Sequence, residues 1–156
     1  MKKYFLTMTA AAILLSGCAS TGSASKTVDL ETVRAGISEI QDAPAMMELP
    51  SDDITSFLGV NPENYTTAVC FVPMMNVTAT EVLLFQYETD TQKTAIQTAL
   101  DKRLSQLENT WSQYLPAQYD LVKACTAVDE NQVLGYIIGE EAFVTSVKQL
   151  ISNNTK

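Results

Sequence analysis

The sequence predicts an α+β fold: a four-stranded, mainly antiparallel sheet in a strand-strand-helix arrangement that occurs twice, preceded by amino-terminal helices. Two pairs of runs rich in β-forming residues, 66–75 with 81–88 and 121–128 with 132–138, predict the strands. A helical pattern follows each pair, and apolar residues at helical spacing precede the first. With 156 residues, 46% of them apolar, the chain suffices for one domain with a core.

The segment before the first strand pair contains two predicted helices. From Val28 onward, apolar residues recur at steps of three and four, namely Leu30, Val33, Ile37 and Ile40. Residues 46–50 form a break. Ser51 is a suitable N-cap for a short helix that ends at Gly59.

The longest predicted helix covers 92–115, with Asp90 as its cap and Pro116 as its stop. A hairpin turn at 129–131 joins the later strands, and Gly139 begins the last helix. Both faces of the predicted strands are apolar. We therefore expect the two later helices to cover one face and the amino-terminal helices at least part of the other.

The chain begins like a secretory signal. Two lysines follow Met1, residues 4–15 are mostly apolar, and Leu15-Ser16-Gly17-Cys18 comes next. This tetrad resembles the bacterial lipobox, which implies cleavage after Gly17 and thioether lipidation of Cys18 by a diacylglycerol, with further acylation such as palmitate. An ordinary signal peptide with a chance cysteine is the alternative.

These features divide the chain into three parts. Residues 1–17 are a signal peptide that is removed, 18–26 a lipidated flexible tether of small polar residues, and 27–156 a single globular domain of unknown function. Two acyl chains provide the double anchor that stable membrane attachment requires. The expected location is extracytoplasmic, lipid-anchored to the bacterial cell membrane.

Composition excludes several functions. Ten basic and 18 acidic residues give a formal net charge of −8, which argues against nucleic-acid binding. Without histidine, Ser-His-Asp and Cys-His catalysis and zinc sites of the Cys/His type are ruled out. The acidic runs lack the alternating pattern of a calcium loop. We expect no catalytic residues, no metal and no cofactor.

Cysteines and methionines provide two candidate features, a disulfide and a contact surface. Cys70 and Cys125 are candidates for a disulfide, which an extracytoplasmic location permits; two free buried thiols are the alternative. Pro73, Met74, Met75 and Asn76 form a candidate contact surface if Met75 is exposed, because methionines make adaptable apolar contacts. The alternative is that one methionine of each Met-Met pair fills the core.

Three motifs carry a family resemblance: 58–63 (LGVNPE), 72–81 (VPMMNVTATE) and 111–119 (WSQYLPAQY). Together with the lipobox, they resemble the bacterial lipoproteins of domain-of-unknown-function family 4358. The resemblance covers nearly all of the chain from Val28 onward. It implies one membrane-anchored extracytoplasmic domain and brings no catalytic residues.

The sequence therefore predicts a non-enzymatic binding or accessory lipoprotein at the cell envelope. Its expected partners are the membrane, through the lipid on Cys18, and as a candidate an envelope protein. One alternative is a small-solute-binding lipoprotein, for which the mature chain is short. The other is an envelope hydrolase that uses paired carboxylates, which needs a cleft that a sequence does not reveal.

Overall fold

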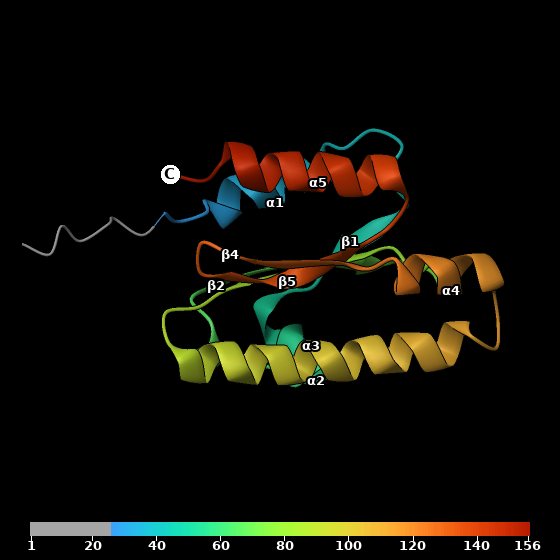
Figure 1. The fold of residues 1–156 in the computed structure, drawn as a ribbon, viewed down its shortest axis with the longest axis horizontal. Helices are drawn as coiled ribbons and strands as arrows, with labels where there is room; N and C mark the ends of the chain where they lie inside the picture. The colour runs from blue at the N-terminus through green and yellow to red at the C-terminus, as the bar shows by residue number, and fades with distance from the viewer. Residues whose placement is uncertain (1–25) are drawn as a thin grey trace, which may run out of the picture.

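The computed structural model describes residues 26–156, and in this part of the chain one antiparallel sheet of five strands runs in the order β1-β2-β3-β5-β4 (Figure 1). The strands are β1 (Met46–Glu48), β2 (Thr67–Pro73), β3 (Glu81–Gln86), β4 (Thr126–Glu130) and β5 (Val133–Ile138). The helices are α1 (Leu30–Ser38), α2 (Ser51–Leu58), α3 (Asp90–Trp111), α4 (Pro116–Lys123) and α5 (Glu141–Asn153), with a 3-10 turn η1 (Pro62–Asn64). The predicted α+β class is confirmed.

The predicted count of four strands is wrong. Segment 46–50, interpreted as a break, contains β1, which pairs with β2 and places Met47 opposite Val72. Only three residues long, β1 shows no period of its own, and its strand conformation depends on pairing with β2.

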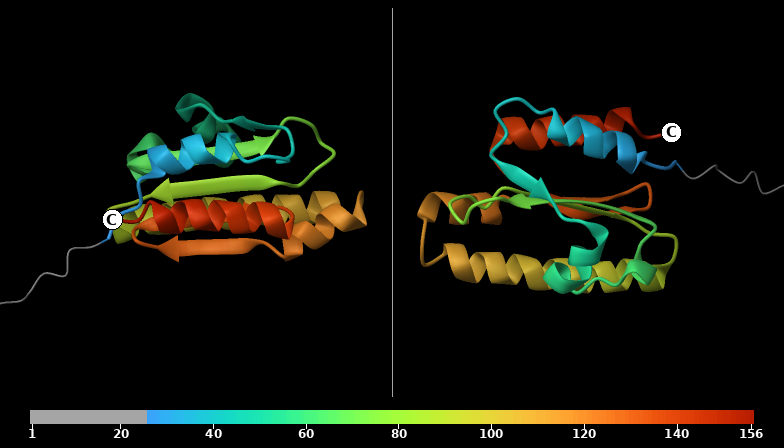
Figure 2. Two further views of the ribbon diagram at one scale, coloured as in Figure 1. Left: turned by 90° about the horizontal axis from the view of Figure 1, so that it is seen from above. Right: turned by 180° about the vertical axis from the view of Figure 1, so that it is seen from behind.

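The helices divide between the two faces of the sheet differently from the prediction. One core cluster lies between the sheet and α2, α3 and α4, whereas the other lies between the sheet and α1 and α5. Figure 2 shows α1 and α5 side by side above the sheet, with α3 below it. The two later predicted helices thus cover opposite faces. Strand residues are buried on both faces of the sheet, so the strand pattern alone does not show which helix covers which face.

Several element boundaries also differ from the prediction. Residues 121–123 of the expected strand 121–128 belong instead to α4 (Pro116–Lys123), which has Pro116 in its first turn. Thr89, not Asp90, caps α3 through a capping box with Gln92. The turn between β4 and β5 lies at Asn131 and Gln132, both with positive φ.

The two ends of the described chain meet. Thr27 and Lys156 exchange two backbone hydrogen bonds of 2.9 Å. In Figure 1 the chain enters the domain at this end, whereas α4 and the last turn of α3 lie at the opposite end. No helix within residues 26–156 is both long and apolar enough to cross a membrane.

Candidate functional site

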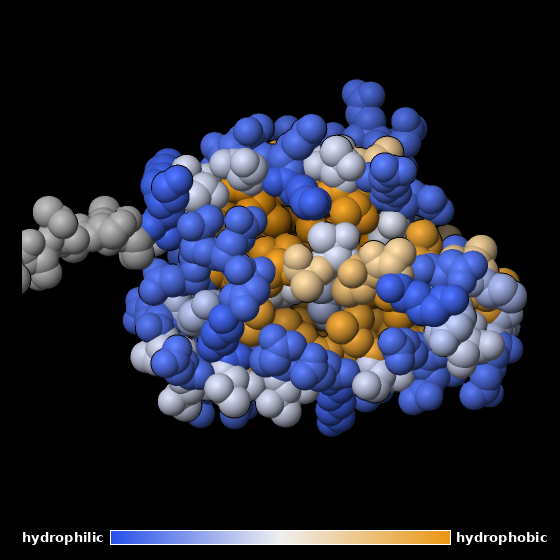
Figure 3. Space-filling view, viewed as in Figure 1, coloured by the Kyte–Doolittle hydropathy of each residue, from blue (hydrophilic) through white to orange (hydrophobic). Residues whose placement is uncertain are grey.

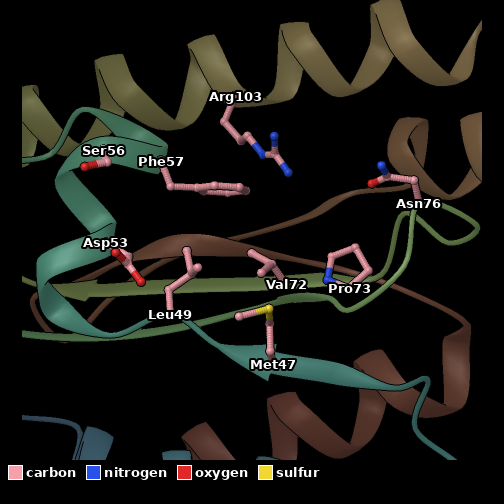
Figure 4. A pocket seen from close by; sticks show the side chains of 9 residues that line it. All are labelled: Met47, Leu49, Asp53, Ser56, Phe57, Val72, Pro73, Asn76 and Arg103. Atoms are coloured by element: carbon pink, nitrogen blue, oxygen red, sulfur yellow. The ribbon is translucent and has the colours of Figure 1, made fainter.

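Two neighbouring cavities lie where α2, α3 and the segment that joins β2 to β3 come together. The first has a volume of about 500 Å³ and the second about 420 Å³. Pro73, Asn76 and Arg103 line both of them. Figure 4 shows the first cavity, with Arg103 reaching down from α3 and Met47 reaching up from β1.

The loop at 74–80, which contributes Asn76, Thr78 and Ala79 to the cavity walls, begins where the strand pairing ends. β2 and β3 pair only as far as Phe71 and Val82, so the chain leaves the sheet after Pro73, which has no N–H to donate. Two hydrogen bonds hold the loop: the Ala79 N–H donates to Gln118 Oε1 of α4 at 2.8 Å, and the Met74 N–H to the Ala45 carbonyl at 3.0 Å.

A buried polar cluster lies beside the second cavity. Arg103 donates from Nη2 to Glu81 Oε2 at 2.7 Å and from Nε to Glu81 Oε1 at 3.2 Å. The Tyr136 hydroxyl donates to the same Oε1 at 2.6 Å. Glu81 is fully buried, so its charge is compensated by these two partners rather than by water.

Helical spacing explains why an arginine reaches this cluster. Arg103 lies four residues before Leu107 and three after Leu100, on the buried stripe of α3. Its guanidinium carbon is 4.5 Å from the centre of the Phe57 ring of α2, and that aromatic face favours the cation. Burial lowers the pKa of Arg103, but the hydrogen bonds to Glu81, the charge of Glu81 and smaller contributions from Tyr136 together outweigh this and raise the pKa overall.

Large exposed apolar side chains gather around the two cavities. Within residues 26–156 six such side chains are exposed, and we call them the apolar rim: Met47, Phe57, Met74, Met75, Val77 and Tyr114. Each lines a cavity or belongs to the 74–80 loop. Exposed apolar side chains that gather in one region are typical of a binding surface, whereas scattered apolar residues are not.

The candidate contact surface predicted from the sequence belongs to this site. Met74 is 62% exposed and Met75 61%, so the alternative of one core methionine fails for this pair. It does hold for the other pair, because Met46 packs against the core of α1 and α5 whereas Met47 belongs to the rim.

The opposite edge of the sheet presents a different surface. Figure 3 shows an apolar band between the two helical layers on the side where β4 lies, bordered by hydrophilic residues. A cavity of about 370 Å³ is found there, lined in part by Asp129 and Glu130. No rim residue belongs to it, and its two carboxylates oppose the addition of another strand.

Cys70 and Cys125 are both free thiols. Cys70 lies on β2 and Cys125 directly before β4, with β3 and β5 between them. At about 4.8 Å per strand spacing, three steps separate them by roughly 14 Å, which is too far for a disulfide. Burial raises the pKa of both thiols, that of Cys125 to about 11, and the charge of Glu81 adds to the effect.

The predicted lipidation site and signal peptide lie outside the described residues. Gly17 and Cys18, with most of the tether, precede residue 26. Among residues 26–156, no group of three or more Cys, Asp or Glu side chains is arranged to hold a metal ion.

Sequence reasoning did not single out Arg103, Phe57, Glu81 or Tyr136. One signal was available, because Glu81 begins an otherwise apolar strand and Arg103 interrupts the apolar stripe of a helix. A charged residue in each of two core-facing positions indicates a buried pair.

The fold and the site define a small α+β domain with an apolar rim around two cavities and a buried ion pair beside them. Residues 38–139 match the family described as a domain of unknown function, DUF4358. The chain belongs to this family, as its three motifs indicated. No curated protein and no solved structure shows significant similarity to the chain.

Proposed function

We propose that this protein is a membrane-anchored extracytoplasmic lipoprotein that acts as a non-enzymatic binding or accessory module at the cell envelope. The apolar rim and the two cavities are its binding surface. The observation that carries the proposal is the gathering of all six large exposed apolar side chains of residues 26–156 around these cavities. Exposed apolar area is removed from water when a partner binds, which favours association.

The position of the site supports an anchored role. The second cavity is lined by residues from the last turns of α3, at the end of the sheet remote from residue 26 (Figure 1). A lipid on Cys18 would hold the other end of the domain near the membrane. The rim would then be presented to proteins of the envelope rather than to the bilayer.

The small-solute alternative retains one supporting observation, since cavities of about 500 and 420 Å³ match the size of small-ligand sites. The hydrolase alternative has less support. The carboxylate of the second cavity, Glu81, already accepts hydrogen bonds from Arg103 and Tyr136 on both of its oxygens.

The test compares variants of the full-length protein by chemical crosslinking in native membranes, with mass spectrometry of the captured proteins. Met75→Asp places a charge on the rim, and Gln149→Asp places the same charge on exposed α5, on the other face. We expect Met75→Asp to lose captured proteins that Gln149→Asp retains. An unchanged profile for Met75→Asp would remove the rim as the binding surface.

Anchoring is tested separately by Cys18→Ala. We expect the variant to leave the membrane fraction and to incorporate no labelled palmitate. Retention in the membrane with lipid label would contradict lipidation at Cys18.

A further inference from the structure

Trp111 leaves an unused hydrogen-bond donor at the second cavity. Its side chain lines this cavity and is only 4% exposed, and its Nε1–H has no acceptor among residues 26–156. Leaving a buried donor unpaired is costly, and the great majority of such groups are satisfied. The neighbouring ring, Tyr114, lies 6.2 Å away between centroids, is 66% exposed and lines the same cavity.

We infer that the second cavity binds a main-chain carbonyl of an apolar segment of a partner polypeptide, which accepts a hydrogen bond from Trp111 Nε1–H. This inference rests on the proposed function and names the chemistry of its ligand. Three features of the site support it: its charge, its free donors and the shape of the rim.

The charge of the site favours a neutral acceptor. The guanidinium of Arg103 is already matched by the carboxylate of Glu81, which is fully buried. A second carboxylate at this point would lie beside Glu81 with no further cation to compensate it, because Arg103 is the only basic residue that lines the cavity. A carbonyl oxygen accepts hydrogen bonds without adding charge.

The available donors fit such an acceptor. Glu81 engages Nε and Nη2 of Arg103, and no described residue accepts a hydrogen bond from Nη1. Asn76 contributes a side-chain amide to the same cavity. Together with the indole, these groups offer N–H donors to the two lone pairs of a carbonyl oxygen.

The rim indicates a polypeptide rather than a small molecule. The two cavities share Pro73, Asn76 and Arg103, and the rim continues past them from Tyr114, just after the end of α3, to Met47 on β1. An extended chain, rising about 3.3 Å per residue, would place apolar side chains along this surface. Methionines such as Met74 and Met75 adapt to side chains of varied shape.

The experiment uses the fact that the chain contains one tryptophan, so that its indole N–H gives a single, unambiguous NMR resonance. The mature full-length protein is titrated with N-acetyl-leucine methylamide, which is neutral and presents two amide carbonyls. The matched probe is N-acetyl-leucine, which carries a carboxylate instead. We expect the neutral probe to shift the indole resonance saturably, with an affinity at least about threefold higher than that of the acid.

Two variants separate the hydrogen bond from the shape of the cavity. Trp111→Phe retains an aromatic ring without the donor, and Met75 methyl resonances then report binding. We expect the neutral probe to bind about fivefold more weakly to this variant, as the loss of one hydrogen bond requires. Thr98→Ala, on the exposed side of α3, is the control and is expected to leave the affinity unchanged.

Three results would overturn the inference. The first is no shift of the indole resonance with the neutral probe at about 50 mM, a concentration at which even a very weak ligand binds. The others are tighter binding of the acid and equal binding of the neutral probe to Trp111→Phe and the native protein. If Met75→Asp nevertheless loses captured proteins in membranes, the proposed function stands and only the carbonyl chemistry fails. If both experiments fail, the proposed function fails with it.

Discussion

Arg103 binds the fully buried carboxylate of Glu81 through two hydrogen bonds, 2.7 Å from Nη2 to Oε2 and 3.2 Å from Nε to Oε1. The pair joins the middle of α3 to the first residue of β3, directly after the 74–80 loop. It therefore fixes the helix that forms one wall of both cavities. The same pair places a cation at a site surrounded by exposed apolar side chains.

Arg103→Met leaves the carboxylate of Glu81 buried without its cation. We expect a loss of about 3–5 kcal/mol in the free energy of unfolding, measured by urea denaturation. The double variant Glu81→Leu/Arg103→Met removes both charges and is expected to recover part of that loss, because the buried Tyr136 hydroxyl then lacks its acceptor. A double variant less stable than Arg103→Met would contradict the ion pair as the cause.

Gly135→Ala tests the close approach of β5 to β3. A Cβ at Gly135 would lie 1.9 Å from the backbone oxygen of Leu83, which does not move independently of the sheet. We expect a loss of more than about 3 kcal/mol in the free energy of unfolding, or no soluble protein.

The matched control for that substitution is Gly36→Ala. The added Cβ there would meet the end of the Leu150 side chain, which is able to rotate, and alanine favours α1 by up to about 1 kcal/mol. We expect its stability to remain within about 1 kcal/mol of the native value. Equal stability of the two variants would contradict the close approach of the β3 backbone to Gly135 on β5.

Gln132→Gly tests the turn between β4 and β5. Asn131 and Gln132 have φ of 50° and 62°, the positive pair that favours Asn-Gly in two-residue hairpins. We expect a gain of about 0.5–1 kcal/mol in stability by urea denaturation, because glycine removes the strain of a side chain at positive φ. A less stable variant would argue against this turn.

The thiol of Cys125 provides a test of pH dependence. Burial raises its pKa from 9.0 to about 11, so its thiolate fraction at pH 8 is about a hundredfold lower than that of a free thiol. Alkylation by iodoacetamide, followed by mass spectrometry, is expected to be slow at pH 8 and to accelerate about tenfold per pH unit up to pH 10.

The raised pKa of Cys125 also makes the stability of the folded protein depend on pH. In the unfolded chain the thiol ionises near pH 9, whereas in the folded protein it does so near 11. Stability from this group is therefore complete below about pH 9 and is lost as pH rises toward 11. Cys125→Ala should weaken this alkaline dependence. Rapid alkylation at pH 8, or a mass that changes by two protons on reduction, would contradict two buried free thiols.

The sequence was informative about local structure where a pattern was long. Strands β2, β3 and β5 and helix α3 were located because each has a sustained apolar pattern. Strand β1 was missed because three residues show no period. Segment 121–128 was rich in β-forming residues, yet its first three residues complete the helix that Pro116 begins.

The candidate site was predictable only in part. Exposure of Met75 entered the sequence analysis only as a condition, beside the alternative of one core methionine in each pair, and both Met74 and Met75 are exposed. The cluster of Glu81, Arg103 and Tyr136 was not found, because its three members lie on β3, α3 and β5 and meet only through the fold. No local spacing connects such residues.

The proposed function places the binding surface at the apolar rim and not on the opposite face. The most direct measurement places one photo-crosslinking side chain at Met75 or at Gln149 in the full-length protein and irradiates native membranes. We predict that the probe at Met75 crosslinks one envelope protein reproducibly, and that the probe at Gln149 does not. Equal crosslinking from both positions, or capture from Gln149 alone, would contradict the account.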